Sequence, residues 1–74
     1  MKNQWYRQIS VIGESIIDCY ATYTDGNIKA LQVRNGFKRL NDNSIAHNDG
    51  DIITILELVT DVELLEELGN TDSL

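Results

Sequence analysis

The stretch WYRQISVIGESIIDCYATYT, residues 5–24, decides which fold class the chain can have. Residues 5–12 alternate between two faces and are rich in aromatic and β-branched side chains, which predicts a β-strand. Gly13 then interrupts the pattern. Residues 14–24 fit two patterns, because their apolar residues recur at both helical and strand spacing. Their many Thr, Tyr and Ile residues favour a strand, and a helix is the alternative.

The middle of the chain predicts two hairpins. Residues 28–34 are expected to form a strand that pairs with the strand at 14–24 through a turn in the sequence TDGN. Asn35-Gly36 is the strongest short signal for a two-residue hairpin turn, because both of its residues accept positive φ. Residues 37–40 are therefore expected to return antiparallel to residues 28–34.

Two more strands are predicted before the C-terminal region. The first is a short strand over residues 44–47, and a turn follows at residues 48–51. The second spans residues 51–58, a segment that is apolar at five of its eight positions. Its first half reads as a near-continuous apolar run, and we expect other elements to cover both of its faces.

The stretch TDVELLEELG, residues 60–69, predicts a short C-terminal helix. Thr60 and Glu63 have the spacing of a capping box, and Gly69 suits the position just after the helix. Three apolar residues are expected to face the body of the protein, namely Val62, Leu65 and Leu68. Residues 70–74 are expected to form a frayed tail.

These elements predict an α+β fold that is mostly β. We expect a small curled antiparallel sheet or barrel of four to six short strands, followed by the short C-terminal helix. With 74 residues, the chain is expected to be a single domain spanning residues 1–74. A helix at residues 14–24 remains the alternative for that segment.

Charge is distributed unevenly along the chain, whose net charge is −6. Residues 1–40 contain six basic and three acidic residues, whereas residues 41–74 contain nine acidic residues and no basic one. Such asymmetry suggests an electrostatic partner, although acidic residues also keep a small protein in solution. One cysteine rules out an intramolecular disulfide, and no signal peptide or membrane-spanning run is recognisable. We therefore expect a cytoplasmic protein.

The sequence contains little that indicates catalysis. Cys19 and His47 are a conceivable nucleophile and base, but Cys19 is more readily explained as a small core residue. The acidic turn after His47 does not have the ligand spacing of a calcium loop. No glycine-rich phosphate loop is present. We expect neither enzymatic activity nor a cofactor nor a bound metal.

The acidic end instead predicts a surface that binds a protein partner. A row of carboxylates on a helix resembles the charge row of a nucleic-acid backbone, so it is attracted to basic grooves. Apolar anchors are also required for affinity. The residues expected to contact the partner are Asp49, Asp51, Asp61, Glu63, Glu66, Glu67, Trp5 and Tyr6.

A basic group near Asn35-Gly36 offers an alternative. Cations and an aromatic ring at a hairpin tip suit contact with nucleic acid, although the acidic pI of the chain argues against it. The residues of this alternative contact are Lys29, Arg34, Phe37, Lys38 and Arg39. In this alternative the chain is a small β-barrel that forms a symmetric homo-oligomer and binds RNA or a small ligand.

In size and charge, the chain is similar to the small acidic proteins that phages and mobile elements use to block host enzymes. Anti-restriction and anti-CRISPR proteins belong to this class. The similarity implies a non-catalytic inhibitor or modulator that occupies a basic surface on a nucleic-acid-handling protein. No sequence motif accompanies it, so it adds only to the expectation drawn from charge.

Overall fold

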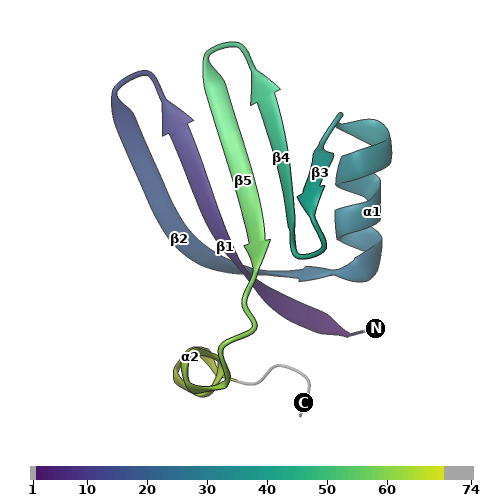
Figure 1. Cartoon of the computed structure of the whole chain (residues 1–74), viewed down its shortest axis with the longest axis vertical. Helices are drawn as coiled ribbons and strands as arrows, with labels where there is room; N and C mark the ends of the chain where they lie inside the picture. Colours follow the sequence, from purple (N-terminus) through teal and green to yellow (C-terminus); the bar gives the residue numbers. More distant parts are fainter. Residues whose placement is uncertain (1, 70–74) are drawn as a thin grey trace.

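A computed structural model of the chain describes residues 2–69 and shows one open five-stranded antiparallel sheet with two helices (Figure 1). The expected frayed tail at residues 70–74 lies outside the described residues. The strand order is β2-β1-β5-β4-β3, so the first strand lies inside the sheet rather than at an edge. The elements, in chain order, are β1 (Asn3–Ile12), β2 (Ser15–Thr24), α1 (Asp25–Arg34), β3 (Lys38–Asn41), β4 (Ser44–Asp49), β5 (Ile52–Leu58) and α2 (Val62–Leu68). The predicted mostly-β α+β class is confirmed, with the sheet open rather than closed into a barrel.

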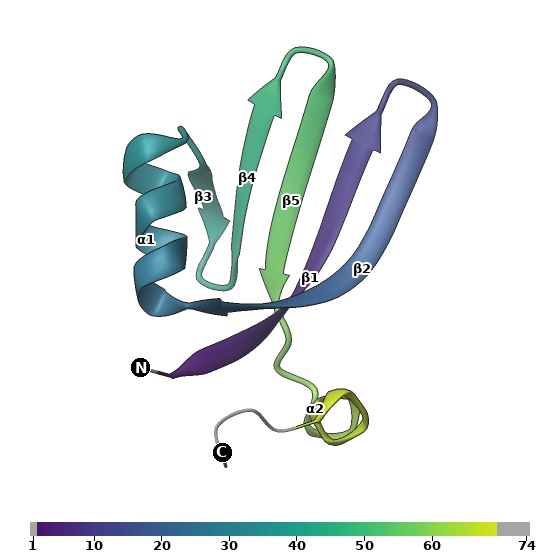
Figure 2. The ribbon, with the colours of Figure 1, turned by 180° about the vertical axis from the view of Figure 1, so that it is seen from behind.

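β1 and β2 form a hairpin, which confirms the strand interpretation of residues 14–24. Ile12 pairs with Ser15 across a two-residue turn, and Gly13 has the positive φ of 60° that such a turn needs. β1 pairs with β2 along all ten residues, from Asn3 to Ile12, but with β5 only from Tyr6 onward. Residues 3–5 of β1 and their partners, residues 22–24 of β2, therefore leave the sheet as a two-stranded ribbon that bends toward α1, as Figure 2 shows from behind.

Residues 28–34 belong to a helix, so the predicted strand there and both hairpins around it are wrong. The Thr24 hydroxyl accepts a hydrogen bond from the Asn27 backbone N–H, and the Asn27 side chain accepts one from the Thr24 N–H, both at 3.0 Å. This capping box begins α1 in the TDGN segment that was expected to be a turn. Asn35 then caps the other end through a 3.1 Å bond from its N–H to the Leu31 carbonyl. Asn-Gly therefore ends a helix here, with Gly36 at a φ of 75°.

The hydrophobic core lies where α1 packs on one face of the sheet. Ile28 of α1 meets Tyr6, Ile45 and Leu56 from the three central strands, and all four are buried. The partly buried residues packed against this cluster are Tyr23, Leu31, Phe37 and Leu58. The core therefore occupies only the end of the sheet that α1 reaches.

The other end of the sheet, near the β1–β2 and β4–β5 turns, exposes apolar side chains on both faces. Ile12 and Ile52 are cross-strand partners on the face of the core, and they are 42% and 39% exposed. Ile53 and Ile16 lie on the opposite face and are 39% and 70% exposed. The expectation that both faces of the first half of β5 are covered is therefore wrong, because α1 docks at the far end.

The remaining predicted elements are confirmed, with two corrections in α2. The helix begins after Asp61, whose carboxylate accepts a 3.0 Å bond from the Glu63 N–H, so Asp61 rather than Thr60 is the cap. Val62 is 67% exposed and does not face the body, unlike the half-buried leucines of the helix. Gly69 has the expected positive φ. Neither helix of the described chain has the length and apolar character needed to cross a membrane.

The capping box of α1 leads to a first prediction. Replacing Thr24 by Ala removes the hydroxyl that satisfies the Asn27 N–H, so we expect the free energy of unfolding to fall by about 1 kcal/mol. Thr24→Ser keeps the hydroxyl and is the matched control. Urea unfolding monitored by circular dichroism measures both, and equal midpoints for the two variants would show that the cap does not support the helix.

Candidate functional site

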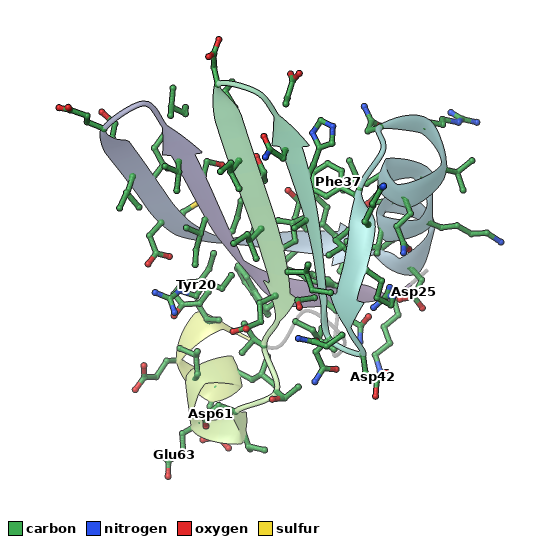
Figure 3. All side chains as sticks on the ribbon, turned by 45° about the horizontal axis from the view of Figure 1, so that its top comes forward. Tyr20, Asp25, Phe37, Asp42, Asp61 and Glu63 are labelled. Atoms are coloured by element: carbon green, nitrogen blue, oxygen red, sulfur yellow. The ribbon has the colours of Figure 1, made fainter. Side chains whose placement is uncertain are left out.

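The exposed carboxylates of α2 and its cap form the first candidate surface, which we call the acidic helix face. Figure 3 shows Asp61 and Glu63 on the outer side of the helix, away from the sheet. All of its members are exposed, whereas the leucines of α2 are half-buried against the body. The acidic helix face consists of Asp61, Glu63, Glu66 and Glu67.

Contacts with β1 hold α2 in place. The Trp5 indole N–H donates a 2.6 Å hydrogen bond to the carbonyl oxygen of Gly69, just after the helix. The Val59 N–H donates to the Trp5 carbonyl at 3.0 Å, so the segment before the helix is also tied to β1. These bonds join residues that are more than fifty positions apart in the sequence, and they fix the direction in which the acidic helix face points.

A partly apolar hollow of about 500 Å³ lies beside the acidic helix face. Trp5, Val62 and Leu65 contribute apolar surface to it, and Lys2 and Glu66 contribute one charged group of each sign. Val62 is largely exposed, and Trp5 is only half-buried despite its bond to Gly69. Carboxylates and apolar side chains thus share one surface. A partner that has both positive charge and exposed apolar side chains could contact the two together.

The structure separates Asp49 and Asp51 from the acidic helix face. Both residues lie at the β4–β5 turn, and α2 follows the opposite end of β5. β5 has seven residues, so the two acidic sets are about 20 Å apart. Asp49 and Asp51 lie instead near Glu14, because Ile12 pairs with Ile52 and so brings the β1–β2 turn beside the β4–β5 turn. We call Glu14, Asp49 and Asp51 the turn rim.

The two expected aromatic anchors have different environments. Trp5 borders the hollow described above, but Tyr6 is a core residue that is only 8% exposed. The Tyr6 ring meets the Tyr23 ring edge to face, with 5.7 Å between their centroids. Burial raises the pKa of the Tyr6 hydroxyl, and the nearby carboxylate of Asp25 raises it further. Tyr6 therefore supports the fold and does not present its ring to a partner.

The residues of the alternative nucleic-acid contact lie on α1 and around β3. Lys29 and Arg34 project from α1, while Lys38 and Arg39 belong to β3. The Phe37 ring stacks on His47, with centroids 5.2 Å apart and planes 26° apart, so it is engaged within the protein. Phe37 also packs against the core.

Arg39 is similarly engaged, in a cleft of mixed charge between α1 and the β3–β4 turn. Its guanidinium donates to the carbonyl oxygens of Asn41 and Asp42 at 3.2 and 3.1 Å. The cleft has a volume of about 470 Å³ and contains Asp25 and Asp42 as well as Lys29 and Arg39. These carboxylates offset the cations, which weakens the case for a phosphate-binding surface.

The structure does not bring Cys19 and His47 together. Cys19 lies on β2 and His47 on β4, with β1 and β5 between them, so about 14 Å separates their backbones. Cys19 is exposed, which corrects the expectation that it is a core residue. Within residues 2–69, no group of three or more His, Cys, Asp or Glu side chains is arranged to hold a metal ion.

Comparisons with protein-family models, with characterised proteins and with solved structures give no match. The candidate surfaces must therefore be judged by their geometry and charge. The acidic helix face combines exposed carboxylates, a partly apolar hollow and a defined orientation. The turn rim combines three carboxylates with exposed isoleucines, a feature that the sequence analysis missed because it assumed covered strands.

The attachment of α2 leads to a second prediction. Trp5→Phe keeps an aromatic ring but removes the N–H that bonds Gly69. We therefore expect the free energy of opening α2 to fall by about 1 kcal/mol. Amide hydrogen exchange at Leu65 and Gly69, whose N–H groups close the helix, should accelerate roughly fivefold. The amides of β1 that pair with β5 are the internal control. Equal exchange of α2 in both proteins would show that the indole bond does not hold the helix.

An exposed ion pair leads to a third prediction, which concerns pH. Arg7 donates two hydrogen bonds to Asp18, the shorter at 2.6 Å, and this bonding lowers the pKa of the Asp18 carboxyl below its ordinary value of 3.8. The contribution of this pair to stability is therefore complete above the ordinary pKa. It is lost as the pH falls through the lowered folded-state pKa.

An NMR titration of the Asp18 carboxyl carbon measures this shift. In Arg7→Gln the pKa should return toward 3.8, because the hydrogen bonds from the guanidinium are removed. An unchanged Asp18 titration in Arg7→Gln would show that the ion pair is not formed in solution.

Proposed function

We propose that this chain is a non-catalytic binding protein whose acidic helix face occupies a basic surface on a nucleic-acid-handling protein. The proposed role is that of an inhibitor or modulator in the cytoplasm, of the anti-defence type found in phages and mobile elements. The observation that carries the proposal is the placement of four exposed carboxylates beside a partly apolar hollow on one small, anchored helix.

Charge and apolar surface would make different contributions to such a complex. The carboxylates attract a basic partner over a distance and speed the encounter, an effect that salt weakens. Trp5, Val62 and Leu65 supply apolar surface that is removed from water on contact. The bond from Trp5 to Gly69 reduces the freedom that the helix would lose on binding.

The fourth prediction tests whether the acidic helix face is the binding surface. The partner is first captured from a nuclease-treated lysate of the cognate cell with the tagged chain, and is eluted with a salt gradient. Its dissociation constant is then measured for two variants. Glu63→Gln/Glu66→Gln/Glu67→Gln removes three charges from the acidic helix face and should weaken binding roughly tenfold or more.

The matched control removes the same amount of charge from the turn rim. Glu14→Gln/Asp49→Asn/Asp51→Asn changes the net charge equally but at the opposite end of the sheet. We expect its affinity to stay within a factor of about two of the wild type. Equal weakening in both variants would indicate a response to net charge only, and an effect confined to the turn rim would move the binding surface there.

A further inference from the structure

The two edge strands of the sheet differ in their protection against pairing with another strand. β3 has only four residues, its register with β4 is irregular between Arg39 and Asn41, and its sequence includes two cations. Short length, irregularity and positive charge all discourage pairing at an edge. β2 has ten residues, an uninterrupted register with β1, and no Pro, Lys or Arg. Its edge therefore lacks the features that normally prevent association.

The turn between β1 and β2 determines which backbone groups point outward from the β2 edge. Ile12 and Ser15 flank a two-residue turn, so they form the first hydrogen-bonded pair of the hairpin. Hydrogen-bonded and non-hydrogen-bonded pairs alternate in an antiparallel ladder. The N–H and C=O groups of residues 16, 18, 20 and 22 consequently point away from β1. In the part of the chain that the structure describes, no strand lies beyond β2 to receive them.

The side chains along this edge are mostly apolar. Ile16 is 70% exposed and Ile17 is 51% exposed, while Tyr20 is 41% exposed and Cys19 is also exposed. Asp18 is the single charged residue of the strand, and the guanidinium of Arg7 in the same chain neutralises it at 2.6 Å. The β2 edge is thus locally neutral, although the chain as a whole has a net charge of −6.

We propose that the β2 edge pairs antiparallel with the β2 edge of a second copy of this chain, about a two-fold axis at Cys19. The result is a dimer with one continuous ten-stranded sheet. Because the one charged residue of the edge is paired within its own chain, two copies meet with little repulsion in any register that keeps their Asp18 side chains apart. A two-fold axis places matching faces of the two strands side by side. This dimer does not depend on what the acidic helix face binds.

The charge on Asp18 selects the register. Only residues 15–21 of β2 lie beside the part of β1 that also pairs with β5, so only they form the edge of the five-stranded sheet. An axis at Asp18 would place two carboxylates directly opposite each other, which is unfavourable. An axis at Ile17 would place each Asp18 opposite Ile16 of the second copy and remove water from the carboxylate.

An axis at Cys19 avoids both problems. Each Asp18 then lies opposite Tyr20 of the second copy, whose hydroxyl group is a hydrogen-bond donor. Ile17 lies opposite Ala21, so a large and a small apolar side chain meet on the same face. Cys19 forms a non-hydrogen-bonded pair with its own copy, for which the Cα atoms are about 4.5 Å apart. That separation is within the range that a disulfide spans.

Oxidative cross-linking tests this register. Diamide accepts two electrons and two protons from a pair of thiols, which leaves a disulfide and the reduced reagent. We expect it to convert most of the wild-type chain into a covalent dimer within minutes. The control is Ala21→Cys in a Cys19→Ser background, which places a thiol on the same strand and face. In the proposed register its two thiols are about 13 Å apart, so cross-linking should be at least tenfold slower. Equal rates would overturn the register.

Sedimentation equilibrium tests the dimer itself. We expect wild type and Cys19→Ser to approach twice the mass of one chain as concentration rises. Cys19→Lys puts two like charges opposite each other and should weaken dimerisation roughly fivefold. Val33→Lys adds the same charge on α1, where Val33 is 74% exposed, and should dimerise as the wild type does. If the wild type keeps the mass of one chain up to about 1 mM, its dissociation constant is weaker than that of most specific complexes. That result would overturn the proposal.

Discussion

The antiparallel pairing of β1 with β5 is the interaction on which the rest of the structure depends. It joins residues 6–12 to residues 52–58 and so connects the N-terminal hairpin to the three-stranded unit of β3, β4 and β5. This pairing closes a loop that runs from residue 12 to residue 52. Closing so long a loop costs conformational entropy, which the interactions that form afterwards must offset. Those interactions include the core, because Tyr6 on β1 and Leu56 on β5 meet only when the two strands pair. They also include the attachment of α2, which rests on Trp5 of the same strand.

The position of α1 determines which part of the sheet is a core and which part is a surface. Residues 3–5 of β1 and residues 22–24 of β2 bend away from the sheet as a ribbon and bring the chain to α1 at one end. Ile28 and Leu31 then cover that end. Within residues 2–69, no other long element is present to cover the remainder. The isoleucines near the two turns therefore stay in contact with water on both faces of the sheet.

Strands were predictable from the sequence because alternation and β-branched composition are local properties. The helix α1 was not, because Thr24 and Asn27 suit both a turn and a capping box, and Asn35-Gly36 suits both a hairpin and a helix end. Exposure was harder still, since alternation identifies two faces but not which one is covered. Cys19 was therefore expected in the core. Tyr6 and Trp5 are neighbours in the sequence, and only tertiary packing separates the core residue from the one beside the hollow.

The two proposed interactions use different parts of the surface, and salt affects them in opposite ways. The acidic helix face lies beyond the end of β5, whereas the proposed dimer axis passes through the middle of β2 at the other side of β1. Two copies with a net charge of −6 each repel at long range, so salt should strengthen the dimer by screening that repulsion. A complex of the acidic helix face with a basic partner should respond in the opposite way, because salt screens its attraction. Opposite signs of the salt dependence therefore distinguish association through β2 from binding through α2, even when both occur in one solution.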